Sequence, residues 1–177
     1  MQQGEKQRQE KPRARWSKPL EGVLKLNCDA SYFVESNSGN WGFLIRESDG
    51  DVILTGRGKV DYLLSAFQAE LIACLQGVQA ALDLGIGRLI PETDALMIQQ
   101  ELFSAEPCAR PEGNMADDLK ALVHSNFLQF ECVFKNRDCN RAAHALGYEC
   151  VEGDELITSP TPSNVLVIVT ANIAAAE

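Results

Sequence analysis

The stretch WGFLIRESDGDVILTGRGKV (Trp41–Val60) decides the fold. Two runs rich in branched and aromatic residues flank Asp49–Gly50, and an Asp-Gly turn between such runs strongly indicates an antiparallel hairpin. The earlier run GVLKLNC (Gly22–Cys28) alternates enough to predict another strand, and the segment from Ser31 to Asn40 has the Ser, Asn and Gly content of a connection. We therefore expect three antiparallel strands at the start of the chain, the first of them ending at Asp29.

A long helix is predicted over Ser65–Leu84. One apolar stripe recurs at helical spacing, and a stripe of small residues beside it would let the helix approach a sheet closely. The apolar stripe contains Leu71, Leu75, Val78 and Leu82, and the second stripe contains Ala66, Glu70, Cys74, Gly77 and Ala81. Gly85 is a candidate residue for ending this helix.

The rest of the chain predicts alternating elements. We expect strands at 88–94 and 127–137, and helices at 95–103, 115–126 and 138–151. A helix between the third and fourth strands permits a right-handed crossover, which would place the fourth strand parallel to the first. The predicted fold class is therefore α/β, with a five-stranded mixed sheet (three antiparallel strands, then two parallel) flanked by helices.

Composition predicts one domain with two terminal extensions. The net charge is −9, yet residues 1–19 hold six Lys or Arg against two Glu, which leaves 10 basic and 23 acidic residues, or −13, in the remainder. We expect residues 1–20 to be a basic, disordered arm, 21–157 the domain, and 158–177 a tail whose apolar run Val165–Val169 docks on the domain.

Location and cysteine chemistry follow from the same composition. No apolar run approaches the ~18–20 residues of a membrane span, and the N-terminus lacks the apolar segment of a signal peptide. The six cysteines form no CxxC pair, so reduced buried thiols are favoured over disulfides or a zinc site. We expect a cytoplasmic or nuclear monomer that does not bind membranes.

Three carboxylates are predicted to converge. If the first and fourth strands are parallel neighbours, Asp29 and Asp94 lie at adjacent carboxyl ends, and Glu70 on the crossing helix can point to the same place. Such a cluster raises its own pKa values unless a hard divalent cation such as Mg²⁺ neutralises it. Each residue alone has a simpler interpretation: a turn aspartate, a glutamate favoured by the helix dipole, and a helix cap.

The blocks LKLNCDASYF, WGFLIRESDGDVILTGRG, SAFQAELIACLQGVQAALDLGI, LIPETD and NRDCNRAAHAL resemble the type 1 ribonuclease H domain. The resemblance is closest to the reverse-transcriptase-like version abundant in plants and often derived from non-LTR retroelements. It covers roughly residues 22–150, and five blocks in the right order are jointly specific.

The resemblance implies an endonuclease that cuts the RNA strand of an RNA–DNA hybrid by two-metal-ion hydrolysis with Mg²⁺, or with Mn²⁺. By motif position, Asp29, Glu70 and Asp94 would be the metal ligands and catalytic residues. Ala30, Ser31, Asn40 and Asn140 would be candidate substrate contacts. Recognition would read the shape of the hybrid and its 2′-hydroxyls rather than its sequence.

The chain departs from the family pattern at its fourth acid. His144 occupies that position, and an imidazole is a poor Mg²⁺ ligand. Three interpretations stay open: a functional substitute that orients water or moves a proton, a sign of weakened nuclease activity, or an uninvolved helix residue. Asn140, one helical turn earlier, could support His144, whereas Asp138 is better interpreted as a helix cap than as a replacement acid.

Two further departures concern substrate binding. Ala30 stands where the family usually has Gly, and the segment between Ala105 and Asp118 is net acidic where some bacterial relatives carry a basic hybrid-binding helix. Weak substrate affinity, or dependence on Mg²⁺ and on the N-terminal arm, would follow. The leading hypothesis is thus a ribonuclease H, with a catalytically weak nucleic-acid-binding module as the alternative and an interaction domain using Val165–Val169 as a third.

Overall fold

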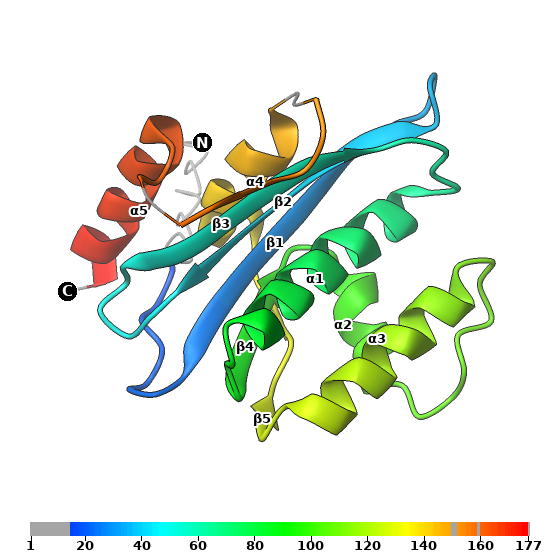
Figure 1. The fold of residues 1–177 in the computed structure, drawn as a ribbon, viewed down its shortest axis with the longest axis horizontal. Coiled ribbons are helices and arrows are strands. Elements are labelled where there is room, and N and C mark those ends of the chain that lie inside the picture. Colours follow the sequence, from blue (N-terminus) through cyan, green and yellow to red (C-terminus); the bar gives the residue numbers. More distant parts are fainter. Residues whose placement is uncertain (1–14, 150–151, 159, 177) are drawn as a thin grey trace, which may run out of the picture.

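The structure is a computed structural model that describes residues 15–149, 152–158 and 160–176. A mixed sheet forms its centre, with helices on both faces (Figure 1). The strands are β1 (Leu24–Phe33), β2 (Ser38–Arg46), β3 (Val52–Val60), β4 (Arg88–Thr93), β5 (Gln129–Phe130), β6 (Val133–Phe134) and β7 (Glu155–Ile157). The helices are α1 (Ala66–Asp83), α2 (Leu96–Phe103), α3 (Gly113–Asn126), the short 3₁₀ helix η1 (Arg137–Cys139), α4 (Arg141–Tyr148) and α5 (Ser163–Ala176).

The strand order is β5-β4-β1-β2-β3-β7, and β6 also pairs with β4. β1, β2 and β3 are antiparallel neighbours, whereas β4 runs parallel to β1 with Asn27 opposite Glu92. The helix α1 makes the crossover between β3 and β4. The predicted α/β fold class and the parallel placement of the fourth strand are therefore confirmed.

The first strand is longer than the sequence predicted. β1 continues past Asp29 to Phe33, and residues 30–33 pair with residues 38–41 of β2. The connection is only a tight turn, in which Asn37 takes a positive φ of 48° that asparagine tolerates better than most residues. Asp29 therefore lies within a strand and does not end one.

Both edges of the sheet also differ from the prediction. The run 127–137 forms two short strands, β5 and β6, because their pairing with β4 is interrupted at Glu131–Cys132. At this break the Glu131 N–H donates a hydrogen bond to the Leu89 carbonyl. At the opposite edge, β7 pairs with β3, and its three residues carry no alternation that the sequence could reveal.

The two faces of the sheet bury separate apolar clusters. On one face, α1 packs directly on the sheet with α2 and α3 behind it (Figure 1). Its small residues are used as predicted, because the Gly77 backbone lies against Leu26 of β1. On the other face, α4 and α5 enclose a smaller cluster with Leu44 of β2 (Figure 1).

The terminal segments contribute to the body. In α5, Val165 and Val169 are buried against α4 and β2. Trp16 is only 2% exposed, so the packed body begins before residue 21, while residues 1–14 of the expected arm lie outside the described residues. No helix in the described part of the chain has the length and apolarity to span a membrane. The cysteines at 28, 74, 108, 132 and 139 are free thiols.

Candidate active site

The three predicted carboxylates come together where β1 and β4 part. Asn27 of β1 pairs with Glu92 of β4, and Asp29 and Asp94 each follow two residues further along the chain. Asp29 is 3% exposed and lies close enough to Asp94 for the two carboxyl groups to share a hydrogen bond. Glu70, on the second turn of α1, faces the same place and is hydrogen-bonded to the Ala30 backbone.

Burial and mutual repulsion shift the pKa values of two members of this cluster. Burial is the main cause that raises the pKa of Glu70 from 4.5 to about 9, and the charges of Asp29 and Asp94 add to it. Burial also raises the pKa of Asp29 from 3.8 to about 6, with the charge of Asp94 as the next cause, while His144 opposes the shift. The protein surroundings therefore do not neutralise the negative charge that converges here.

The donor set suits a hard divalent cation in its chemistry. Carboxylate oxygens are the ligands that Mg²⁺ prefers, and Oε2 of Glu70 is buried with no hydrogen-bond partner among the described residues. As the side chains stand, however, no three His, Cys, Asp or Glu residues in the described part of the chain are grouped closely enough to share one ion. The residues fit the cation, and binding it would require the carboxylates to close around it.

The imidazole ring of His144 contacts the carboxylate of Asp29. Its Nδ1 is 2.7 Å from Oδ2 of Asp29, and its ring packs at a tilt against Tyr148. A carboxylate only accepts hydrogen bonds when ionised, so Nδ1 carries the proton and donates to Asp29. The contact with Asp29 is what the first two interpretations of His144 predict, a functional substitute or a sign of weakened nuclease activity.

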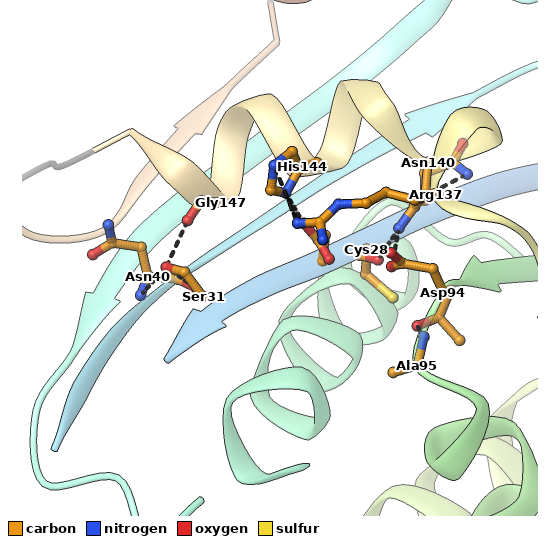
Figure 2. Close-up of polar contacts among 12 residues, drawn as sticks. Cys28, Ser31, Asn40, Asp94, Ala95, Arg137, Asn140, His144 and Gly147 are labelled. Carbon is orange, nitrogen blue, oxygen red and sulfur yellow. Dashed lines mark hydrogen bonds and ion pairs between the residues drawn. The ribbon is translucent and has the colours of Figure 1, made fainter. Parts of the chain in front are cut away.

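Arg137 is a member of the site that sequence reasoning missed. Its Nη2 lies 3.2 Å from Nε2 of His144 and 2.9 Å from Nδ1 (Figure 2). Because Nδ1 donates to Asp29, Nε2 is the nitrogen that can accept from the guanidinium. The sequence signal was the seven-residue spacing to His144, but the intervening 3₁₀ helix η1 hides the geometry.

Asn140 faces inward. Its Nδ2 donates to the Cys28 carbonyl at 2.7 Å and to Oδ1 of Asp94 at 3.1 Å (Figure 2). The side chain is 1% exposed, so its contacts are made with the protein and with the carboxylate cluster. Asn140, rather than Asp138, is the residue before α4, and Asp138 lies inside η1, which corrects the expected cap.

The other candidate substrate contacts tie β1 and β2 to α4. Oγ of Ser31 donates to the Gly147 carbonyl at 3.0 Å and accepts from the Asn40 N–H at 3.2 Å (Figure 2). Ala30 is half-buried and uses its backbone toward Glu70. The hydrogen bonds of Ala30, Ser31 and Asn40 thus help to hold α4 and Glu70 in place.

Two glycines let α4 come close enough to place His144. A Cβ on Gly147 would lie 2.9 Å from the Asp29 carbonyl oxygen, and a Cβ on Gly42 would clash with the backbone of Gly147. Real Cβ atoms do not come this close to backbone, so both positions depend on glycine. This close contact sets the height of α4 above β1.

The fold and the position of the acidic cluster define an RNase H-like protein: a mixed sheet crossed by α1, with carboxylates at the point where β1 and β4 diverge. The family model described as "Reverse transcriptase-like" matches residues 27–150. The chain belongs to this family. No curated protein sequence compared with the chain matches it.

Several solved structures that resemble this chain are ribonucleases H. RNase H1 from Halobacterium salinarum aligns with a TM-score of 0.64 at 19% identity, over 70% of this chain and 93% of that one. The N-terminal RNase H domain of Rv2228c from Mycobacterium tuberculosis, a fusion with maltose-binding protein, gives 0.65 at 14%, over 88% and 99%. LC11-RNase H1 in complex with an RNA/DNA hybrid gives 0.63 at 12%, over 70% and 92%. At these identities the likeness shows the fold alone.

Proposed function

We propose that the protein is a Mg²⁺-dependent ribonuclease H that cleaves the RNA strand of RNA–DNA hybrids, with Mn²⁺ as an alternative metal. The observation that carries the proposal is the convergence of Asp29, Glu70 and Asp94, with a pKa of about 9 at Glu70 and an unpartnered Oε2 on the same residue. A structural acid cluster would be expected to have its charge compensated by protein groups.

The three carboxylates would hold the cation. Bound Mg²⁺ supplies a polarised water and stabilises the departing oxygen in phosphodiester hydrolysis. Asp29, at the centre of the cluster, would face the metal with the oxygen that His144 leaves free, and Asp94 with the oxygen opposite its bond to Asn140. Oε2 of Glu70 has no hydrogen-bond partner among the described residues, so Glu70 would lose its proton, and no hydrogen bond of Oε2 to another described residue, on binding the cation.

His144 and Arg137 would manage charge and protons beside the cluster. The imidazole, 2.7 Å from Asp29, lowers the pKa of that carboxyl against the effect of burial, which keeps Asp29 available as an anion nearer to neutral pH. The half-exposed ring can also pass a proton to solvent. Arg137, bonded to the same ring, places a positive charge where a phosphate would approach.

An RNA–DNA hybrid is the proposed substrate, like the hybrid in the LC11-RNase H1 complex. Recognition would rest on shape and on 2′-hydroxyl and phosphate contacts. The net charge of −9 and the acidic segment between Ala105 and Asp118 predict weak, salt-sensitive affinity. We also propose that the chain is the retroelement-derived plant type, active as a monomer in the cytoplasm or nucleus.

A second function is favoured by one observation. His144 already contacts one oxygen of Asp29, and within the described part of the chain no three ligands are grouped as they stand, so a hybrid-binding module with weak turnover is the alternative. The two functions differ in what Asp94→Asn does: it would abolish cleavage by the nuclease, and leave binding by the module unchanged.

The test is cleavage of an end-labelled RNA–DNA duplex in Mg²⁺ and in Mn²⁺, with duplex RNA and duplex DNA as substrate controls. We expect wild type to cut the RNA strand, and Asp29→Asn and Asp94→Asn to lose at least about a hundredfold in rate. Wild type cutting no faster than Asp29→Asn would exclude catalysis, and salt-dependent hybrid binding in the same preparations would then support the module.

A further inference from the structure

Next to the acidic cluster lies a buried network of polar side chains. The contacts within this network are not needed to form the acidic cluster itself. The network joins β1, β2, β4 and the start of α4 through five side chains: Lys25, Asn27, Arg46, Glu92 and Asn140. The network contains two cations and one anion. Arg46 is 0% exposed, and although burial lowers its pKa to about 10, that value leaves it charged at neutral pH.

Three hydrogen bonds form a chain from Arg46 to Asp94, and in each of them the donor is the residue nearer to Arg46 along the chain. Nη2 of Arg46 donates to Oδ1 of Asn27 at 2.5 Å, and Nδ2 of Asn27 donates to Oδ1 of Asn140 at 3.2 Å. Nδ2 of Asn140 then donates to Oδ1 of Asp94 at 3.1 Å. Each amide accepts on the side of Arg46 and donates on the side of Asp94.

The charged groups decide which way each amide faces. A guanidinium can only donate and an ionised carboxylate only accepts, so Arg46 holds Oδ1 of Asn27 while Glu92 holds Nδ2 at 3.0 Å. A flipped Asn27 would put like poles together at both contacts. Its orientation in turn points Oδ1 of Asn140 inward and its amino group at Asp94.

Residues near both ends of the chain contact Arg46. Its guanidinium lies 3.7 Å from the centre of the Trp16 ring, and Nη1 donates to Oδ1 of Asn172 on α5 at 3.3 Å. Lys25 is anchored nearby, because its Nζ donates to the Ser17 carbonyl at 2.5 Å and to Glu92 at 2.7 Å. Trp16, Ser17 and Asn172 all lie outside the segment that the family model matches.

We propose that Arg46 is a positioning residue that fixes the carboxylate of Asp94 through Asn27 and Asn140, and that Trp16 and Asn172 hold Arg46 from outside the family segment. In this arrangement Asn140 binds one oxygen of Asp94, Oδ1. The catalytic meaning of this positioning rests on the proposed function, but the positioning itself does not.

The experiment compares Arg46→Met, Arg46→Lys and Asn172→Leu with two matched controls on α5. Thr170→Val removes a hydroxyl that bonds only within the helix, to the Leu166 carbonyl, and Val169→Ala loosens the apolar contact of α5 without touching the network. Three readouts are taken at a temperature where every variant is folded: the side-chain amide signals of Asn140 by NMR without metal, Mn²⁺ affinity by calorimetry, and kcat and KM for a hybrid.

We expect the Asn140 amide signals to move and exchange faster in Arg46→Met, and Mn²⁺ affinity to fall about tenfold, as for other groups that orient a metal ligand. The value of kcat should fall and KM should stay near wild type. Arg46→Lys should recover part of the loss, Asn172→Leu should lose less than Arg46→Met, and Thr170→Val should match wild type.

Two results would overturn the proposal. One is a folded Arg46→Met whose Asn140 signals and Mn²⁺ affinity equal those of wild type. The other is Val169→Ala reproducing the losses of Asn172→Leu at the same melting temperature, which would make the effect general loosening. If wild type neither binds Mn²⁺ nor cuts, the proposed function fails, and the Asn140 signals still decide whether Arg46 positions that side chain.

Discussion

At the scale of single residues, Glu70 is the clearest sign of a site that works with a cation. Its pKa of about 9 means that the metal-free protein keeps a proton on a carboxyl that the unfolded chain would lose near pH 4.5. Since the native state binds this proton more tightly, it stabilises the fold below about pH 4.5 and the contribution is lost as pH rises toward 9.

The free energy of unfolding in EDTA should therefore fall as pH rises from 5 to 9. One pKa unit corresponds to about 1.4 kcal/mol, so we expect a fall of at least about 2 kcal/mol in urea unfolding of wild type. Glu70→Gln keeps the size of the side chain and removes its titration, so its unfolding free energy should change much less over the same range. Equal pH dependence in the two proteins would contradict the shift.

The pair His144–Asp29 makes a separate prediction about pH and rate. Because the hydrogen bond and charge of His144 lower the pKa of Asp29, His144→Ala should raise that pKa above about 6 and move the acidic limb of the activity profile to higher pH. A rise of one pKa unit would lower the ionised fraction of Asp29 at pH 6.5 about threefold and barely change it at pH 8, so activity at pH 6.5 should fall about threefold relative to pH 8.

The control for this prediction is His124→Ala. His124 lies on α3 beside a cavity of about 500 Å³ formed with α2 and β5, on the other face of the sheet from α4. Its loss should leave the pH profile of cleavage unchanged. A parallel drop at every pH in His144→Ala would mean that the imidazole does not act through the ionisation of Asp29.

At the scale of elements, the sequence predicted what local pattern controls. The Asp-Gly hairpin, the helix α1 and the placement of β4 beside β1 by the crossover rule are confirmed. Of the predicted apolar stripe of α1, Leu71 and Val78 are buried, whereas Leu75 and Leu82 are half-buried. The breaks between β5 and β6, the strand β7 and the helical form of α5 could not be predicted, because they depend on which edges and faces remain to be covered. Arg46 and Arg137 were missed since their partners lie on other elements.

The docking of α4 gives a prediction that opposes helix propensity. Alanine is favoured over glycine inside a helix by about 1 kcal/mol, yet Gly147→Ala should destabilise the protein by about 1–3 kcal/mol because the new Cβ meets the Asp29 carbonyl. The lift of α4 should also separate His144 from Asp29 and lower the rate of cleavage. Thermal unfolding and hybrid cleavage measure the two effects.

Gly87→Ala is the matched control, because a Cβ there would meet only the end of the Leu128 side chain at an ordinary distance of 3.5 Å. Its stability and activity should stay near those of wild type. If Gly147→Ala were as stable and as active as Gly87→Ala, the close contact would not be what sets the position of α4.

At the scale of the whole molecule, the segment that matches the family model is covered by the residues before and after it, which we call its flanks. Residues 27–150 contain all the proposed metal ligands, but Trp16 covers the buried cations of β1 and β2, and α5 covers Leu44 and α4. The two flanks meet at Arg46, since Trp16 stacks on its guanidinium and Asn172 accepts from it. A unit drawn from family similarity alone would thus leave a charged core open to water.

A fragment of residues 22–157 should therefore be largely unfolded under conditions where the full chain is folded. Removing one buried tryptophan costs about 3–5 kcal/mol, and loss of the α5 contacts adds to it, against a total stability of about 5–15 kcal/mol for a typical domain. Circular dichroism and limited proteolysis would measure the difference. Trp16→Ala in the full chain tests the N-terminal flank alone, because it removes the tryptophan side chain and keeps α5. A 22–157 fragment that melts with the full chain would show that the flanks only rest on a core that is stable without them.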